Sequence, residues 1–434
     1  MAITDAPKIV TARLGFDDSH TLERYLATDG YEGLRRALQM TPEAVQAEVD
    51  AVSLLGRGGA GFPAGRKWSM LRPAPTTYLV VNGDESEPAT FKDHLLIERD
   101  PHQILEGIVI AAYAIQATTA FLYIRGEFAL GLERVTAALN EAYDHGAVGS
   151  DIFGSGFSVD IVVHPGAGAY ICGEETALLE SLEGKRGFPR IKPPYFPAAI
   201  GLYGEPTVVN NVETLSNLPF VLRQGSAAFA ALGAGRSTGT RLFALAGHVA
   251  RPGVYEVEMV KTTFRDLIYA PVLGAGIPGG RALKAFIPGG ASAPWFGPDQ
   301  VELPLGQDEV GQAGSMLGSG SVVVMDETTC VVRAAWRITR FFRRESCGQC
   351  TPCREGSGWL EKILRRIEDG QGRESDLDLL MDVSDNLAPG VSWPPEQTTI
   401  CVLGPSIPSS IASALRMFRD EFLLHIKDGA CPHA

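Results

Sequence analysis

The sequence predicts an α/β domain with a largely parallel sheet, followed by a small unit of strands and a helical C-terminal domain. Between residues 78 and 163, short apolar runs alternate with helical stretches, which is typical of a parallel sheet covered by helices. Paired strand patterns replace this alternation near residue 240, and helical periodicity returns from residue 326 onward. The chain of 434 residues is longer than one typical domain, so about two to four domains are expected.

The α/β region begins with helices and a glycine-rich loop. Residues 1–55 have helical, partly amphipathic patterns. Thr41 followed by Pro42 is a typical helix start, because threonine caps a helix and proline fits its first turn. After the glycine-rich loop at 56–65, we expect strands at 78–81, 120–124 and 158–163, with helices at 102–116 and 127–145.

The second half of the chain changes its pattern twice. Residues 241–258 read as two strands around Pro252-Gly253, a pair that favours a type II turn. A short helix at 262–269 and a strand at 283–287 complete a small unit. The helices expected beyond it are at 331–342, 355–368, 374–386 and 409–426.

Composition excludes several classes of protein. The formal net charge of −13 argues against a nucleic-acid partner. No apolar run reaches the roughly 20 residues of a membrane-spanning helix, and Met1 to Asp5 lack the basic and apolar regions of a signal peptide. Seven cysteines are an odd number and too sparse for a secreted disulfide scaffold. We therefore expect a soluble protein of a reducing compartment, which reaches a membrane only through partner proteins.

Three cysteines repeat at every third position: Cys347, Cys350 and Cys353. A glycine and a proline between them favour a loop. The same C-x2-C-x2-C run opens the bacterial ferredoxin pattern, whose [4Fe–4S] cluster takes four thiolates. The next cysteine of that pattern is missing, because position 357 is serine. The spacing predicts an iron–sulfur cluster whose fourth ligand comes from elsewhere in the chain.

The fourth ligand has several candidates, namely Cys401, Cys330, Cys431 and Cys172. Cys401 is preferred, because it lies in the apolar stretch 399–403, before Gly-Pro, where a strand or turn could close over the loop. A zinc site is an alternative, although structural zinc usually takes paired C-x2-C units or Cys/His sets, and no second pair is present. Thiols without any metal are the third interpretation.

The glycine-rich loop Gly56-Arg57-Gly58-Gly59-Ala60-Gly61-Phe62-Pro63-Ala64-Gly65 contains the spacing G-x-G-x-x-G. A helical stretch precedes it, whereas the Rossmann version follows a strand, so an ordinary Rossmann fold is not expected. Closely spaced glycines still allow backbone N–H groups to approach a ligand. Lys67 can add a charge for a phosphate. A tight surface turn is the alternative.

Acidic loops follow two of the predicted strands. Asn82 to Pro88 follows the strand at 78–81, and Glu174-Glu175 follows the strand at 158–163 through a second glycine-containing loop. Ligands of open α/β sheets gather at the carboxyl ends of the strands, so both loops should meet in one crevice. Their carboxylates suit hydroxyl and carboxamide groups rather than phosphate. Solvated loops are the alternative.

Two further segments supply groups for a nucleotide. Residues 185–197 mix bases, prolines and aromatics, and could cover a nucleotide with an aromatic ring for adenine and Lys192 or Arg190 for phosphate. The amides of Asn210 and Asn211 and the hydroxyl of Thr214 could bind phosphate oxygens without charge.

Taken together and in this order, six motifs resemble the NADH-oxidising flavoprotein subunit of respiratory complex I. The resemblance covers nearly the whole chain. The motifs are Gly-Arg-Gly-Gly-Ala-Gly-Phe-Pro at 56–63, Asn-Gly-Asp-Glu-Ser-Glu-Pro at 82–88, Gly-Ala-Gly-Ala-Tyr-Ile-Cys-Gly-Glu-Glu-Thr-Ala at 166–177, Lys-Pro-Pro at 192–194, Asn-Asn-Val-Glu-Thr at 210–214 and Glu-Ser-Cys-Gly-Gln-Cys-Thr-Pro-Cys-Arg-Glu-Gly at 345–356.

The resemblance implies a fold of three domains: an α/β flavin-binding domain with glycine-rich loops, a ubiquitin-like β-grasp domain, and a C-terminal helical bundle carrying an iron–sulfur cluster. The implied divisions are an N-terminal helical segment with the glycine-rich loop at 1–65, the FMN- and NADH-binding α/β domain at 66–238, the β-grasp (SLBB-like) domain at 239–325 and the helical [4Fe–4S] domain at 326–434.

The resemblance also implies roles by position. Glu87 and Glu175 become the catalytic positions, which orient the nicotinamide and its ribose. Cys347, Cys350, Cys353 and Cys401 become the cluster ligands. The implied contacts to FMN or NADH are Gly56, Arg57, Gly58, Gly59, Ala60, Gly61, Phe62 (against the adenine region), Lys67, Asn82, Asp84, Glu85, Tyr170, Gly173, Glu174, Lys192, Tyr195, Asn210, Asn211 and Thr214.

The implied activity is that of the NADH-oxidising subunit of the bacterial, proton-translocating NADH:quinone oxidoreductase. NADH would pass a hydride to FMN, and electrons would pass singly to the [4Fe–4S] cluster. Implied partners are a [2Fe–2S] thioredoxin-like subunit and a large multi-cluster iron–sulfur subunit. The implied location is cytoplasmic, at the inner face of the plasma membrane, with the membrane arm reached only indirectly.

Two alternatives to this function stay open. One is the diaphorase subunit of a soluble NAD-linked formate dehydrogenase or hydrogenase. Those relatives often carry further cluster domains, which this sequence does not show, so complex I is favoured. The other is a structural or regulatory iron–sulfur protein, which would need the cysteines but neither of the acidic loops.

Overall fold

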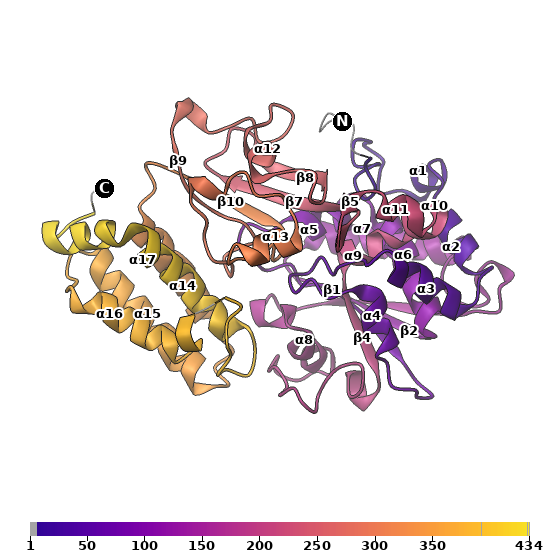
Figure 1. Cartoon of the computed structure of the whole chain (residues 1–434). Coiled ribbons are helices and arrows are strands. Elements are labelled where there is room, and N and C mark those ends of the chain that lie inside the picture. The colour runs from indigo at the N-terminus through magenta and orange to yellow at the C-terminus, as the bar shows by residue number, and fades with distance from the viewer. Residues whose placement is uncertain (1–6, 392, 432, 434) are drawn as a thin grey trace.

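The computed structural model describes residues 7–391, 393–431 and 433. The residues on which the expectation about a signal peptide depends, Met1 to Asp5, lie outside these ranges. In Figure 1 the indigo-to-magenta α/β region, the orange unit of strands and the yellow helical bundle follow one another along the chain, and the bundle forms one end of the molecule. The three-part organisation expected from the sequence is therefore visible as three regions.

The α/β region is built on a parallel sheet with strand order β3-β2-β1-β4. The side chains of β1 alternate between two cores: Leu79 and Val81 face the helices on one side, while Val80 belongs to the core shared with the C-terminal bundle. Burial on both faces explains why the strands read as continuous apolar runs. The strands are β1 (Tyr78–Gly83), β2 (Thr119–Ile124), β3 (Asp160–Pro165) and β4 (Thr207–Asn211).

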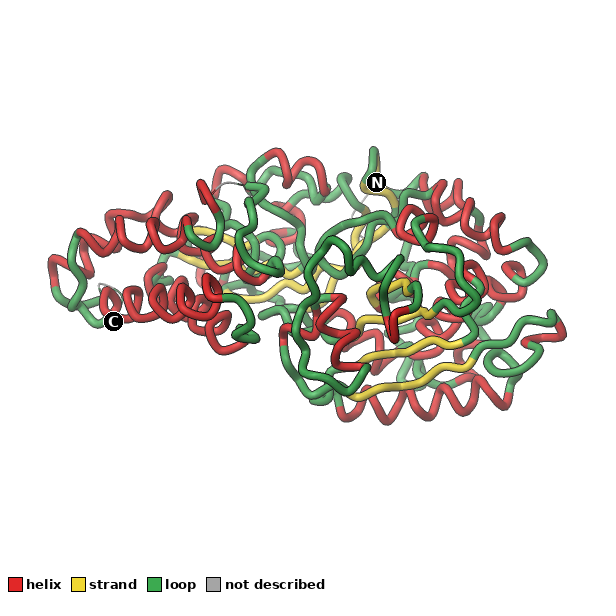
Figure 2. The backbone as a smooth tube through the Cα atoms, turned by 90° about the horizontal axis from the view of Figure 1, so that it is seen from below, coloured by secondary structure: helices red, strands yellow, loops and turns green. Residues whose placement is uncertain are grey.

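Helices surround this sheet, as the red coils beside the yellow strands in Figure 2 show. The cap predicted at Thr41 is confirmed, because its side chain accepts a hydrogen bond from the Ala44 N–H and Pro42 is the first helical residue. Residues 101–115 form the central helix, buried along almost all its length. The helices are α1 (Leu22–Leu26), α2 (Glu32–Ala37), α3 (Pro42–Ala51), α4 (Ala64–Ser69), α5 (Lys92–Arg99), α6 (Pro101–Ile115), α7 (Ala129–Asp144), α8 (Glu175–Leu182), α9 (Val212–Ser216), α10 (Leu218–Gln224) and α11 (Ser226–Ala230).

The middle unit is a second sheet with strand order β8-β7-β10-β9, in which β7 and β10 are parallel and the outer pairs are antiparallel. The prediction of a type II turn at Pro252-Gly253 is wrong, because Gly253 already pairs with Leu245 in the ladder between β7 and β8. The connecting residues instead donate backbone hydrogen bonds to Gly274 and Gly276. The elements are β5 (Gly233–Ala234), β6 (Ser237–Thr238), β7 (Thr240–Gly247), β8 (Gly253–Glu258), α12 (Phe264–Tyr269), β9 (Leu283–Ile287), α13 (Gln307–Gln312) and β10 (Ser321–Asp326).

The C-terminal bundle consists of α14 (Val331–Glu345), α15 (Thr351–Glu368), α16 (Ser375–Asp385) and α17 (Leu403–Asp428). The cysteine loop opens α15, as expected. Cys401 lies in a turn before α17 rather than in a strand. That helix begins earlier than predicted, because Pro405 lies in its first turn, where a missing N–H costs no hydrogen bond.

Short 3-10 turns join several of these elements. They are η2 (Ile152–Gly154), η3 (Tyr170–Gly173), η4 (Leu202–Gly204), η5 (Pro278–Gly280), η6 (Pro298–Gln300) and η7 (Pro389–Val391). Among the described residues, no helix is long and apolar enough to cross a membrane.

Candidate functional site

One crevice of about 960 Å³ lies at the carboxyl ends of the parallel strands and is bounded by all three regions. The α/β region contributes most of its wall, the loops of the second sheet close one side, and the segment before α17 closes another. Its polar and glycine lining includes Gly56, Gly58, Gly61, Lys67, Asn82, Asp84, Glu85, Glu87, Thr90, Tyr170, Gly173, Glu174, Glu175, Lys192, Asn210, Asn211, Thr214, Ser292, Ser319 and Cys401.

The floor of the crevice is formed by the strand ends. In the register of the sheet, Asn82 of β1 lies opposite Asn211 of β4, and Val81 lies opposite Asn210. The Asn82 amide donates to the Gly173 carbonyl over 2.8 Å, which joins β1 to the turn η3. The side chain of Asn210 accepts from the Trp68 indole at 2.9 Å. The sheet thus places amide groups from separate motifs beside one another.

The glycine-rich loop closes on itself through the Gly56 N–H to Phe62 carbonyl hydrogen bond of 3.0 Å. A Cβ atom at Gly58 would lie 3.0 Å from Cβ of Asn211, so the loop backbone sits directly on the strand end. Phe62 lies at the rim and remains 44% exposed. This surface is available to the flat face of a ligand.

Arg57 of this loop does not present its charge to the crevice. Its guanidinium is buried and donates to the Thr238 and Thr240 carbonyls at 3.2 and 3.0 Å. Its backbone N–H donates to the Thr214 hydroxyl at 2.9 Å. Only the backbone of Arg57 is therefore positioned to contact a cofactor, and its side chain ties the loop to the second sheet.

The carboxyls of the first acidic loop divide into different environments. Glu85 accepts the N–H groups of Lys92, Asp93 and His94 at 2.8–2.9 Å, so it caps α5 from the wall of the crevice. Asp84 accepts from Ser86 through one oxygen, while its other oxygen is buried without a partner. Burial raises the pKa of Asp84 to about 7.

The Glu87 carboxyl accepts three hydrogen bonds. The Tyr170 hydroxyl donates to it at 2.7 Å, and Ser292 donates through its N–H at 2.8 Å and its hydroxyl at 2.6 Å. Burial raises the pKa of Glu87 above its usual range, against these hydrogen bonds. Glu87 thus joins η3 to the second sheet and faces the crevice in a fixed position.

Glu175 lies between two ammonium groups. Lys67 Nζ is 2.8 Å and Lys192 Nζ is 3.1 Å from its carboxylate, and Lys192 also reaches Glu174 at 2.9 Å. Burial by itself would raise the pKa of Glu175, but the two lysines outweigh it and leave that pKa below its usual range. Glu174 caps α8 by accepting the Thr176 and Ala177 N–H groups at 2.9 Å.

The basic segment 185–197 reaches the crevice only in part. Lys192 lines it, but Arg190 is paired with Glu180 and Glu183 at 2.5 and 2.9 Å and does not line it. Tyr195 is 43% exposed and also lies outside the lining, where Phe196 stands instead. The prediction of Arg190 as a phosphate ligand is not supported by this geometry.

The cysteine loop forms a small cavity of its own. Cys347, Cys350, Cys353 and Cys401 line it together, with Ser346 and apolar residues around them. Cys330 and Cys431 do not line it. Burial raises the pKa of Cys353 to about 11 and that of Cys401 to about 12. The thiols of Cys353 and Cys401 are neutral without metal, and binding a metal would release their protons.

Sequence reasoning missed the contribution of the second sheet. Ser292 follows β9 and holds Glu87, and Ser319 precedes β10 and hydrogen-bonds Thr90 at 2.6 Å. A signal was present, because Gly289 and Gly290 closely precede Ser292 and glycines flank Ser319. Gly290 has φ of +94°, and a Cβ there would lie 2.6 Å from Glu87 Cγ. The glycine is required for the close approach of this loop.

These observations test whether FMN and a four-iron cluster fit the chain. The unpartnered oxygen of Asp84 lies in a crevice that also offers amides, hydroxyls and a glycine backbone, the kinds of groups that bind a ribityl chain and phosphate. Four thiols surround one cavity at a helix start. In the part of the chain that the structure describes, the sulfur atoms of these four thiols do not all lie within 4.8 Å of one another, as the ligands of a single ion would. Both groups fit.

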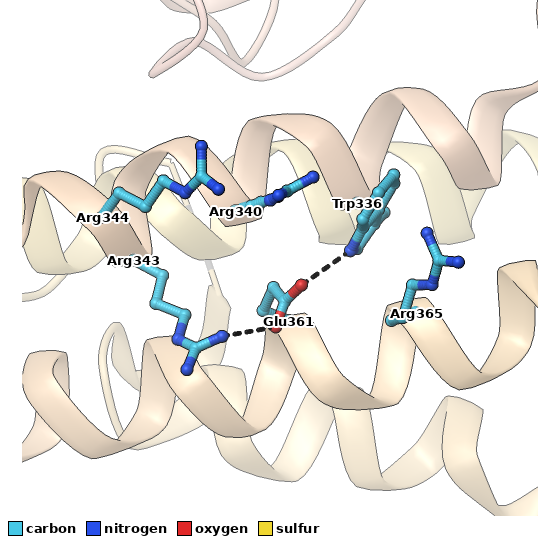
Figure 3. Close-up of a pocket in the computed structure, with 6 residues that line it drawn as sticks. All are labelled: Trp336, Arg340, Arg343, Arg344, Glu361 and Arg365. Carbon is cyan, nitrogen blue, oxygen red and sulfur yellow. Dashed lines mark hydrogen bonds and ion pairs between the residues drawn. The ribbon is translucent and has the colours of Figure 1, made fainter.

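Another hollow lies on the bundle between α14 and α15, away from the crevice (Figure 3). Arg340 and Arg365 lie over the Trp336 ring, with Cζ atoms 5.3 and 4.7 Å from its centre. Glu361 accepts from the Trp336 indole at 2.9 Å and from Arg343 at 2.7 Å. With Arg344 also in its lining, this is a basic patch on an acidic chain.

Comparison with known proteins identifies relatives along nearly the whole chain. The Nuo51 FMN-binding domain matches residues 49–219, and the NADH-ubiquinone oxidoreductase-F iron-sulfur binding region matches residues 333–425. The chain is 49% identical over 418 residues to the NADH-quinone oxidoreductase F 2 subunit of Rhizobium meliloti (strain 1021), a match that covers 96% of each protein. It is also 49% identical over 418 residues to the NADH-quinone oxidoreductase F subunit of Streptomyces coelicolor, covering 96% of this chain and 90% of that one.

A solved structure has the same fold. The crystal structure of an NAD+-reducing [NiFe]-hydrogenase in the H2-reduced state is similar with a TM-score of 0.82 and 32% sequence identity. The match covers 99% of this chain and 68% of that chain.

Proposed function

The chain belongs to the family of F subunits of NADH-quinone oxidoreductase, and from this premise we propose that it oxidises NADH in the crevice and delivers the electrons to the cysteine cavity. FMN, when bound, supplies a hydride acceptor that releases electrons one at a time, and a [4Fe–4S] cluster supplies the one-electron acceptor. The observation that carries the proposal is Cys401, which lines both the crevice and the cysteine cavity. The two sites share a wall.

The residues of the crevice hold and orient the nucleotides. Asn82, Asp84, Asn210, Asn211 and Thr214 surround the strand ends and suit the hydroxyls and phosphate of FMN. The other groups assigned to cofactor binding are the backbone of the loop from Gly56 to Phe62, and Lys67, Tyr170, Gly173, Glu174 and Lys192. Because Glu85 caps α5, its contribution is to place the acidic loop.

Glu87 and Glu175 are assigned to the nicotinamide nucleotide. Each is fixed before a ligand arrives: Glu87 by Tyr170 and Ser292, and Glu175 by Lys67 and Lys192. Carboxylates in such positions accept hydrogen bonds from ribose hydroxyls and the carboxamide. This orients the nicotinamide ring for hydride transfer, where precise placement of the reacting atoms provides much of the rate.

Cys347, Cys350, Cys353 and Cys401 are assigned as the cluster ligands. Their shared cavity supports the choice of Cys401, and the position of Cys330 and Cys431 outside it argues against those thiols. Cys350 precedes α15 and Cys353 lies in its first turn, so the cluster would sit near free backbone N–H groups.

The domain divisions at 65, 238 and 325 are also proposed. The second sheet supports the β-grasp assignment for 239–325, because its order β8-β7-β10-β9 has a central parallel pair and a helix, α12, between its second and third strands. The β10 strand crosses the last division by one residue, Asp326.

We propose further subunits of the respiratory complex as partners, namely a [2Fe–2S] thioredoxin-like subunit and a large multi-cluster iron–sulfur subunit. The basic hollow of Figure 3 supports a docking role for the bundle, because arginines at an exposed patch complement an acidic partner surface. Attachment to the inner face of the plasma membrane would pass through these subunits.

The test is purification of the chain from its source under native conditions. We expect about one FMN and about four irons per chain, a flavin spectrum over a broad cluster absorption, and NADH oxidation with ferricyanide as acceptor. Co-purifying subunits distinguish respiratory complex from hydrogenase. A chain with iron and no flavin would contradict the proposal, and would support a structural iron–sulfur protein.

A diaphorase of the hydrogenase type is the second candidate. The solved NAD+-reducing hydrogenase supports it through the shared fold at 32% identity. The F subunits of NADH-quinone oxidoreductase are closer in sequence, at 49% identity, and match this chain over nearly their whole length. The respiratory assignment is therefore preferred.

A further inference from the structure

A second group of metal-ligating side chains lies in the helical bundle, apart from the cysteine loop. Cys330, Glu368, His425 and Cys431 place their ligand atoms within 4.8 Å of one another. None of the four lines the cavity of the cysteine loop or the crevice. They come from the start of α14, the end of α15, the last turns of α17 and the segment after it, so only the tertiary fold brings them together.

The distances between these atoms suit a single ion. Cys330 Sγ lies 3.3 Å from His425 Nε2 and 3.5 Å from Glu368 Oε2, and the last two atoms are 3.5 Å apart. A tetrahedral zinc with bonds of about 2.3 Å to sulfur and about 2.0 Å to nitrogen or oxygen holds neighbouring ligand atoms roughly 3.3–3.8 Å apart. The described triangle already has this size.

The surrounding groups orient the ligands as they do in known metal sites. His425 Nδ1 is 2.8 Å from the Glu421 carbonyl, which fixes the proton there and leaves Nε2 as the free lone pair. Arg333 holds the other oxygen of Glu368, with Nε 2.6 Å from Oε1. The Arg333 N–H also points to Cys330 Sγ at 3.3 Å.

We propose that Cys330, Glu368, His425 and Cys431 bind one structural Zn²⁺. Two thiolates, a carboxylate and a neutral imidazole form a closed tetrahedral set, the type that zinc uses for structure rather than for catalysis. The complex carries one net negative charge, which Arg333 offsets. Zinc would fasten Cys431, beyond the end of α17, to α14 and α15. This site is independent of the electron path proposed above.

The site is tested on the full chain with its FMN and cluster, produced in zinc-supplemented medium with an affinity tag that binds no metal. We expect about one zinc per chain by mass spectrometry, beside about four irons. Zinc-edge X-ray absorption should show two sulfur neighbours at about 2.3 Å and two lighter ones at about 2.0 Å.

Two variants and a matched control decide the assignment. Cys431→Ser and His425→Ala should each lower zinc content about tenfold or more, with iron and FMN unchanged. His433→Ala is the control, because His433 lies two residues from Cys431 and contacts Glu421 instead of the ligand set. It should keep its zinc. Cys431 lies after the last helix, so its replacement should leave the fold intact. Unchanged iron and FMN contents in Cys431→Ser would show that the chain still folds.

Several outcomes would overturn the proposal. One is a chain without zinc in the supplemented medium. A second is a Cys330–Cys431 disulfide, found by mass spectrometry after alkylation. A third is zinc that persists in both variants, which would be adventitious. A fifth iron that is lost in Cys431→Ser would assign the site to iron.

Discussion

Carboxyl groups that line the same crevice differ in charge and in role because their surroundings differ. Asp84 has one oxygen without a partner, Glu87 accepts from Tyr170 and Ser292, and Glu175 is paired with Lys67 and Lys192. The pKa is raised in the first two by burial and lowered in the third by the lysines, which outweigh its burial. The side chain type alone does not decide the function of a position here.

Asp84 should make the FMN-free chain less stable as the pH rises toward neutrality. Its folded pKa of about 7 lies above the ordinary 3.8, so its stabilising effect is complete below about pH 4 and is lost as the pH rises through 7. Relative to Asp84→Asn, the wild type should lose up to about 4 kcal/mol of unfolding free energy over this interval. Calorimetric Tm values between pH 4 and 8 measure the difference.

The control for this titration is Asp299→Asn, since Asp299 is exposed on the turn η6. That variant should follow the wild type at every pH. Parallel Tm curves for wild type and Asp84→Asn would show that Asp84 does not titrate in this range.

Glu175→Gln should lower kcat/KM for NADH about tenfold, because a charged hydrogen-bond acceptor is lost, while FMN stays bound. Steady-state ferricyanide reduction and flavin content measure the two effects. Glu180→Gln is the matched control, because Glu180 pairs with Arg190 outside the crevice. Loss of FMN with unchanged nucleotide affinity would show that the role of this residue is misassigned.

Cys401→Ser should lose the cluster, because it removes the one ligand outside the loop. We expect a large fall in iron content and loss of the reduced-state EPR signal. Cys330→Ser and Cys431→Ser serve as controls and should keep their cluster iron, since neither thiol lines the cavity. A normal cluster in Cys401→Ser, with loss in one of the others, would refute the assignment.

At the scale of elements, helix starts position much of the site. Glu85 caps α5 and Glu174 caps α8, each from a loop that lines the crevice, and Asn211 at the end of β4 caps α9. A capping side chain satisfies N–H groups that have no partner within the helix. The loops are therefore held by the helices that follow them, and the crevice has a defined shape before a ligand binds.

Lys92 joins several of these elements and should be needed for stability. Its side chain is 1% exposed, and its ammonium lies 2.9 Å from Asp93 and 2.8 Å from Glu213, which in turn accepts the Leu242 N–H of β7. Lys92→Met would leave two buried carboxylates together, and should lower the unfolding free energy by about 3–5 kcal/mol. Chemical denaturation measures this change.

The control is Lys185→Met, which removes an exposed ammonium from Glu183 while that carboxylate keeps Arg190 as a partner, and it should cost about 0–1 kcal/mol. A similarly small loss in Lys92→Met would mean that the buried network contributes little to holding the second sheet on the parallel sheet.

At the scale of the whole molecule, the crevice exists only where the three regions meet. The parallel sheet supplies its floor, the second sheet supplies Ser292 and Ser319, and the bundle supplies Cys401. Segments far apart in sequence thereby place the nucleotide site beside the cysteine cavity. A hydride acceptor and a one-electron acceptor in adjoining sites need no large motion for transfer between them.

The charge of the crevice should select NADH over NADPH. Carboxylates outnumber bases there, and its three lysines are already paired: Lys67 and Lys192 with Glu175, and Lys92 with Asp93 and Glu213. Three further bases precede Lys192 in sequence: Lys185 pairs with Glu183, Arg190 pairs with Glu180, and Arg186 donates to the Cys347 carbonyl at 3.4 Å. A 2′-phosphate usually needs an arginine, so kcat/KM for NADPH should be at least about tenfold lower. A value equal to that for NADH would identify segment 185–192 as a phosphate clamp.

Much of the fold could be read from the sequence, because local patterns determine local structure. The strands expected at 78–81 and 120–124 are confirmed as β1 and β2, and the helix expected at 102–116 is confirmed as α6, each within two residues at its ends. By contrast, α5, α8, β4 and β10 were not predicted. The Val322-Val323-Val324 run of β10, which pairs with β7 and β9, is as apolar as that of β1, so its strand signal was present and was missed.

The sequence by itself determined which chemical groups the chain carries and in what order: three thiols at a fixed spacing, glycine loops, and acidic loops after strands. Only the tertiary structure decided which of these groups meet. Ser292 reaches Glu87 across 205 positions, Cys401 joins the thiols of the loop, and Cys330 and Cys431 join His425 instead. Side-chain spacing along a strand or helix follows from backbone geometry, whereas contacts between distant segments depend on the packing of the whole chain.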